Sequence, residues 1–82
     1  MRIRGVTYHA SQLEKAIECL AEEHALYVEM CAQVVFQNRP VEYRCILQEA
    51  KYRGGIRYVG IGDSLFKALS NAYAGYLGET TT

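Results

Sequence analysis

The sequence predicts a two-layer α+β domain in which two helices pack on a three-stranded antiparallel sheet. Residues 26–37 alternate apolar and more polar side chains, over a length typical of a strand with one buried face. Shorter alternating segments follow at 41–49 and 56–61, and segments with helical apolar spacing flank the three strands. The expected order is helix, strand, strand, strand, helix, and the 82 residues leave room for one domain.

The first helix is expected from Ser11 to about Glu23. Ser11-Gln-Leu-Glu14 fits a capping box, in which each side chain accepts from the backbone amide of the other residue. An alternative interpretation continues this helix through Cys31, because Val28 and Cys31 also fit helical spacing. The long alternation and the β-branched residues favour a strand from residue 26.

Turn residues separate the strands. Residues 37–40 contain Pro40, and residues 51–55 end in two glycines, so both connections are short and the strands should form a meander. Residues 2–8 are β-prone but contain Gly5, and they predict either an extra edge strand or an ordered arm.

The second helix is expected to begin at Asp63 or Ser64 as N-cap. Gly78 is placed to end it as the C′ residue, which leaves 79–82 as a frayed tail. The two helices are expected to cover one face of the sheet. The other face should carry a mixture of polar and apolar side chains, with Tyr27, Cys31, Val35 and Ile46 as its apolar members.

The composition and the net charge argue against several classes of function. Lys+Arg and Asp+Glu are both 9, so no long-range field attracts nucleic acid or an anionic membrane. The three cysteines are widely spaced, which predicts reduced thiols in a cytoplasmic protein rather than disulfides or a zinc site. We expect no signal peptide, no membrane span, no metal and no cofactor.

Catalytic signatures are sparse, so the sequence predicts a protein that is not an enzyme. A small enzyme would need a Cys–His pair that meets in space, such as His24 with Cys31 or Cys45. Gly60-Ile-Gly62 lies between a strand and a helix, but Asp63 opposes an anion there, and the glycines are expected to ease the turn.

Candidate binding residues mix aromatic, basic and apolar side chains, a composition that suits protein interfaces. Those expected on the hairpin are Tyr52, Arg53, Arg57 and Tyr58, and those expected on the sheet are Tyr27, Arg44 and Ile46. We expect a host protein or protein complex as the partner, and the sheet face could also form a homodimer. Binding of single-stranded nucleic acid or a nucleotide through the same residues is the alternative.

The order of elements is similar to that of the double-stranded RNA-binding domain. That family grips phosphates with a basic cluster at the start of its last helix. The corresponding segment here, Asp63-Ser-Leu-Phe-Lys-Ala-Leu, has Lys67 as its single basic residue, so the recognition motif is missing.

The segment Arg57-Tyr-Val-Gly-Ile-Gly-Asp-Ser-Leu-Phe-Lys-Ala-Leu-Ser-Asn-Ala-Tyr73 resembles the closing strand–helix unit of small bacteriophage accessory proteins and some anti-CRISPR proteins. The resemblance implies a compact viral protein that inhibits or redirects a host complex, such as a CRISPR–Cas defence complex, by occupying its surface. It assigns a role to no individual residue.

Overall fold

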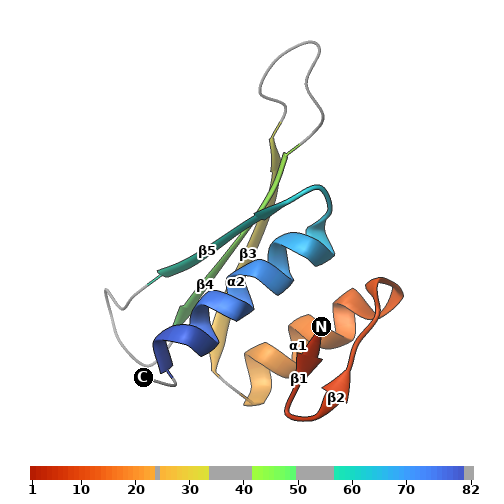
Figure 1. Cartoon of the computed structure of the whole chain (residues 1–82), viewed down its shortest axis with the longest axis vertical. Helices are drawn as coiled ribbons and strands as arrows, with labels where there is room; N and C mark the ends of the chain where they lie inside the picture. Colours follow the sequence, from red (N-terminus) through yellow and green to blue (C-terminus); the bar gives the residue numbers. More distant parts are fainter. Residues whose placement is uncertain (24, 34–41, 50–56, 81–82) are drawn as a thin grey trace.

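The computed structural model describes residues 1–23, 25–33, 42–49 and 57–80. The elements are β1 (Arg2–Ile3), β2 (Val6–Thr7), the 3-10 helix η1 (Ala10–Gln12), α1 (Leu13–Glu23), β3 (Leu26–Gln33), β4 (Glu42–Glu49), β5 (Arg57–Gly62) and α2 (Leu65–Thr80). Strands β3, β4 and β5 form an antiparallel meander, and α1 and α2 lie on the same side of it (Figure 1). The predicted α+β fold is confirmed. Neither α-helix in the described ranges is both long and apolar enough to cross a membrane.

The N-terminal strands form a small hairpin of their own. Arg4 and Gly5 both have positive φ, 49° and 82°, which makes a two-residue turn whose twist matches the flanking strands. The expected extra strand therefore exists, but β1 pairs with β2 and not with the main sheet. Ile3 is 1% exposed, so the hairpin is anchored in the core as an ordered arm.

The helical segment begins at Ala10, one residue before the expected start at Ser11, as the 3-10 helix η1, and α1 follows from Leu13. The backbone N–H of His9 donates to Oε1 of Gln12 at 3.0 Å, and this contact takes the place of the predicted Ser11–Glu14 capping box. After α1 the chain reverses through Ala25, whose φ of 52° is left-handed and incompatible with a continuing helix. The alternative in which the helix runs through Cys31 is therefore wrong.

Strands β4 and β5 begin within one residue of their predicted starts, and the far end of the first predicted strand, residues 34–37, lies outside the described residues. Helix α2 is capped as expected by Ser64, whose Oγ accepts from the Lys67 backbone N–H at 3.1 Å. It continues through Gly78 to Thr80, so the predicted C′ role of Gly78 and the tail starting at residue 79 are wrong. A glycine inside a helix costs only about 1 kcal/mol, too little to end a helix whose earlier turns pack on the sheet.

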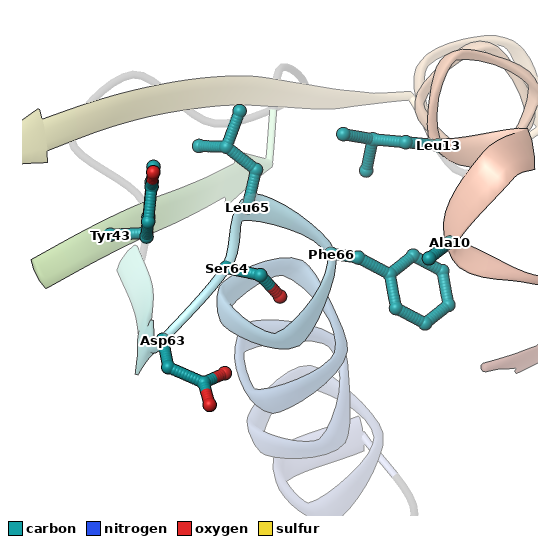
Figure 2. A pocket seen from close by; sticks show the side chains of 7 residues that line it. All are labelled: Ala10, Leu13, Tyr43, Asp63, Ser64, Leu65 and Phe66. Atoms are coloured by element: carbon teal, nitrogen blue, oxygen red, sulfur yellow. The ribbon is translucent and has the colours of Figure 1, made fainter. Parts of the chain in front are cut away.

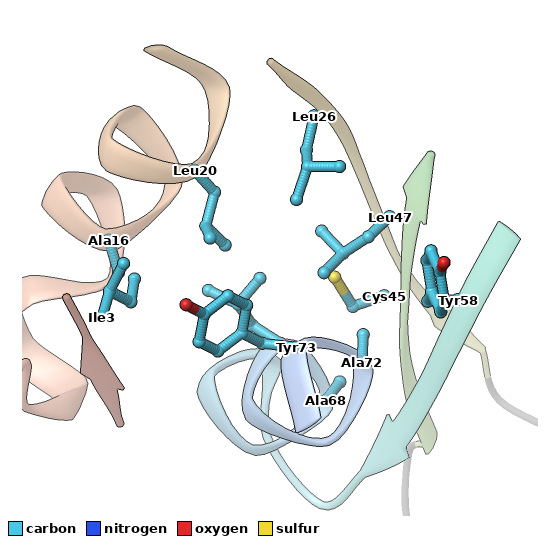
Figure 3. Packing of buried hydrophobic residues seen from close by; sticks show 11 residues of the cluster. Ile3, Ala16, Leu20, Leu26, Cys45, Leu47, Tyr58, Ala68, Ala72 and Tyr73 are labelled. Atoms are coloured by element: carbon cyan, nitrogen blue, oxygen red, sulfur yellow. The ribbon is translucent and has the colours of Figure 1, made fainter. Parts of the chain in front are cut away.

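The hydrophobic core lies between α1, α2, β1 and the inner face of the sheet (Figure 3). Its buried side chains are Ile3, Ala16, Leu20, Leu26, Cys45, Leu47, Tyr58, Ala68, Leu69, Ala72 and Tyr73. Helix α2 approaches β5 most closely at Gly60. A Cβ atom there would overlap the Ala68 carbonyl oxygen and the Ala72 amide nitrogen, and would lie 2.9 Å from the Ala72 Cα. Gly60 therefore permits the close contact between helix and strand.

Candidate functional site: the outer face of the sheet

The sheet face turned away from the helices is the candidate site, and we call it the outer face. The strand register arranges its side chains in three rows across β3, β4 and β5. The rows are Tyr27–Gln48–Arg57, Glu29–Ile46–Val59 and Cys31–Arg44–Ile61. These nine residues alternate with the buried or half-buried side chains of the inner face, as the two-residue period of a strand requires.

The outer face exposes a cluster of large apolar side chains to solvent. Tyr27 is 64% exposed, Val59 is 53% exposed and Ile61 is 48% exposed. Half-buried Ile46 lies between them in the central strand. A folded domain gains free energy by covering such side chains, so a cluster of them on one flat surface indicates a contact surface.

Charged side chains of both signs surround the apolar cluster. Arg44 lies 3.7 Å from the carboxylate of Glu42, its neighbour along the same face of β4. The Arg44 side chain is 41% exposed, whereas its Nε is buried and has no hydrogen-bond partner within the described structure. The aliphatic part of Arg44 thus lies against the sheet, while its terminal nitrogens reach the surface beside the Glu42 carboxylate. Arg57 and Glu29 are exposed at two edges of the face.

Four of the residues predicted from sequence meet on this face: Tyr27, Arg44, Ile46 and Arg57. Tyr58 does not. It is 7% exposed and its ring makes an edge-to-face contact with Tyr76, with centroids 5.4 Å apart, so its predicted role on an exposed surface is wrong. Adjacent residues of a strand point to opposite faces, and an exposed Arg57 places Tyr58 inside.

Two other predicted residues, Tyr52 and Arg53, lie outside the described residues, and their role stays a prediction. Two members of the site were missed, Val59 and Ile61. The signal that could have found them is the alternation along β5. Tyr58, Gly60 and Gly62 face α2, so the residues between them, Val59 and Ile61, face outward.

A second surface feature is a hollow of about 310 Å³ between the starts of α1 and α2 (Figure 2). Its lining is Ala10, Leu13, Tyr43, Asp63, Ser64, Leu65 and Phe66. Asp63 opposes an anion here, and the Ser64 hydroxyl is occupied with the helix cap. The glycines of Gly60-Ile-Gly62 lie against α2, and a Cβ at Gly62 would lie 2.9 Å from the Lys67 Cβ. This geometry favours the structural role expected for the two glycines.

The described cysteines differ in their surroundings. Cys45 is buried, and burial, with a smaller effect of Cys31, raises the pKa of its thiol to about 11. It is therefore protonated at neutral pH and a poor nucleophile. Cys31 is exposed on the outer face. His24, the proposed partner of either thiol, lies outside the described residues, and no cluster of three potential metal ligands occurs within them.

The fold and the site define a small α+β domain whose sheet has one face packed on helices and the other exposed. No protein-family model, curated protein or solved structure matched the chain.

Proposed function

We propose that this protein is a non-catalytic binding protein that docks on a partner protein through its outer face. The observation that carries the proposal is the exposure of Tyr27, Val59 and Ile61 around Ile46, on a sheet face that neither α-helix covers. In this proposal the apolar side chains form the centre of the interface, and Arg44 and Arg57 contact acceptors on the partner.

The composition of the face supports this kind of partner. Tyrosine and arginine are enriched among residues whose truncation weakens protein interfaces, because they combine contact area with specific hydrogen bonds. The central strand places Ile46 between β3 and β5, where a partner would exclude water most completely. The charged residues lie beside this apolar centre, as in the polar rim of a protein interface.

The kind of partner is proposed from the sequence and not from the outer face. We propose a host protein complex, met in the cytoplasm, with the chain acting as a phage-encoded inhibitor or modulator of a defence system such as CRISPR–Cas. This part rests on the resemblance of the C-terminal segment to small phage proteins. The binding role of the outer face is independent of it.

Nucleic acid is the alternative partner, and one observation favours it: Tyr27, Arg44 and Arg57 share one face. Against it, Glu29 lies on the same face and Glu42 accompanies Arg44, so phosphates would meet carboxylates as well as guanidinium groups. A nucleic-acid complex would weaken steeply between about 50 and about 200 mM salt, which a predominantly apolar protein interface would not do.

Two valines give a matched test. Val59 on the outer face and Val6 in the N-terminal hairpin are both 53% exposed and both lie in strands. Tagged wild type, Val59→Asp and Val6→Asp would be used to capture partners from a bacterial host, with and without nuclease. Circular dichroism would check that each variant is folded.

We expect wild type and Val6→Asp to retain the same protein partner after nuclease treatment, and folded Val59→Asp to lose it. Equal retention by the two variants would exclude the outer face as the contact surface. Loss of every bound protein after nuclease would favour the nucleic-acid alternative.

A further inference from the structure

The outer face has a charge pattern that can pair with itself. Glu29 is the partner of Ile46 on the neighbouring strand β3, and Arg44 lies two residues from Ile46 along β4, so the two charges lie in roughly perpendicular directions from Ile46. The whole chain has nine basic and nine acidic residues and a net charge of zero, so no overall repulsion separates two copies.

Two copies of the sheet can be placed face to face by a two-fold axis that lies in the plane of the interface and passes over Ile46. Four simple directions of this axis are possible: along the strands, across them, and along either diagonal of the nine-residue face. An axis parallel to the strands sets Arg44 against Arg44 of the second copy. An axis perpendicular to the strands, in the plane of the interface, sets Glu29 against Glu29 of the second copy. Each of these arrangements brings like charges together, which is unfavourable in a desolvated contact.

The two diagonal axes cross the strands of the two sheets near right angles, which is an established packing of sheets. The axis from Tyr27 to Ile61 leaves Glu29 against Gln48 and forms no charge pair. The axis from Cys31 to Arg57 sets Glu29 against Arg44 of the second copy, twice by symmetry, where Glu29 joins Glu42 as a second carboxylate beside that guanidinium group. The same axis sets Tyr27 against Ile61 and Ile46 against Ile46, so the apolar side chains also meet.

We propose that a second copy of this chain covers the outer face, with the sheets crossed along the Cys31–Arg57 diagonal and Glu29 paired with Arg44 between copies. The two Arg57 side chains meet only at an exposed corner, from which their long side chains reach water. The inference rests on the proposed function in taking the outer face as the binding surface. The homodimer then competes with the partner protein for the same face.

The size of the face sets the strength of this contact. Three strands about 4.8 Å apart, used over about 20 Å of their length, give a footprint of roughly 300 Å² per copy. A standard interface covers about 800 Å² per partner, so the dimer should be weak and reversible. We expect a dissociation constant between about 10 µM and about 1 mM.

The test is sedimentation of untagged protein over this concentration range, with charge reversals at the paired positions. In Glu29→Arg the contact becomes arginine against arginine, and in Arg44→Glu it becomes glutamate against glutamate. We expect each variant alone to dissociate at least about tenfold more readily than wild type. An equimolar mixture should associate again, because both contacts of the heterodimer then join an arginine of one variant to a glutamate of the other.

The double variant Glu29→Arg/Arg44→Glu should also dimerise, since its charges are exchanged but still opposite. Glu18→Arg, on an exposed position of α1, is the matched control and should dimerise like wild type. A monomeric wild type up to about 1 mM would overturn the proposal. A dimer that forms equally well in Glu29→Arg and in Arg44→Glu would also overturn it, because that dimer would use another surface.

The sedimentation experiment and the partner-capture experiment can fail independently of each other. A monomer that still captures a protein in a Val59-dependent manner would refute the homodimer alone. A homodimer that dissociates on charge reversal, in a protein that captures nothing, would refute the proposed function alone.

Discussion

The side-chain amide of Asn71 in α2 donates a hydrogen bond to the backbone carbonyl of Ile61 in β5, with 2.7 Å between nitrogen and oxygen. Strand β5 is at the edge of the sheet, where backbone groups can pair with a strand from another chain. Asn71 binds a backbone acceptor of this edge strand from within the same chain, and the contact ties the helix to the strand.

Asn71→Asp should destabilise the protein. The substitution keeps the size of the side chain but replaces the donor with an acceptor that faces the Ile61 carbonyl. We expect the free energy of unfolding to fall by about 1 kcal/mol, the usual net value of such a bond at an accessible site. Urea denaturation followed by circular dichroism measures it. An unchanged midpoint would show that water replaces the contact without loss.

Gly60→Ala should be strongly destabilising, because the added methyl group meets the backbone of α2 at Ala68 and Ala72. The helix would have to move away from β5, at a cost of about 3 kcal/mol or more. Gly75→Ala in the same helix is the control. Apart from its chain neighbours and the backbone of its own helix, no atom lies within 4 Å of a Cβ at Gly75, so alanine should stabilise the helix by about 0.5–1 kcal/mol. Similar thermal midpoints for the two variants would contradict the close contact at Gly60.

Ile3→Ala should destabilise the whole domain and not only the N-terminal hairpin. Ile3 is 1% exposed and belongs to the core, so truncation should cost about 2–4 kcal/mol. Val6→Ala in the paired strand removes an exposed side chain and should change stability by less than about 0.5 kcal/mol. If both variants unfold at the same denaturant concentration as wild type, the hairpin makes no contribution to the stability of the core.

The raised pKa of Cys45 should make stability depend on alkaline pH. The thiol has an ordinary value of 9.0 and reaches about 11 in the folded protein. Between these values the unfolded chain releases a proton that the folded protein retains. The contribution of this thiol to the free energy of unfolding should therefore be constant below pH 9 and fall as the pH rises from 9 to about 11.

Cys45→Ala is the reference for this measurement. Burial also raises the pKa of Tyr73, and both proteins keep that tyrosine, so the difference between them isolates the thiol. We expect the wild type to lose more stability than the variant over this range, as measured by chemical denaturation at several pH values. Parallel profiles would show that the Cys45 thiol does not contribute.

The fold could be predicted because its main signals are local. The alternation from Leu26 is visible in the sequence, and Ser64 marks the start of α2. What these local signals left open or predicted wrongly lies toward the two ends of the chain. Gly78 looks like a helix terminator, but α2 passes through it. The N-terminal segment has strand propensity, but only the positive φ angles of Arg4 and Gly5 decide that it pairs with itself.

The candidate site was partly predicted for the same reason. Tyr27, Arg44 and Ile46 were assigned to the exposed face from the alternation along their own strands, and the structure places them there. For β5 the basic and aromatic composition was read without its alternation, so Tyr58 was expected on an exposed hairpin together with Arg57, and Val59 was missed. The row that joins Glu29, Ile46 and Val59 depends on the register of three strands, which composition alone does not contain.

The contact between Gly60 and α2 also bears on how this protein's relatives can be recognised. Surface positions can change freely over evolutionary time, whereas a glycine under a helix has no substitute unless the helix moves. Distant relatives that retain this fold should keep a glycine where the last strand passes under the final helix, with small residues at the positions of Ala68 and Ala72. We expect this spaced trio to be retained in such relatives where the rest of the sequence has diverged.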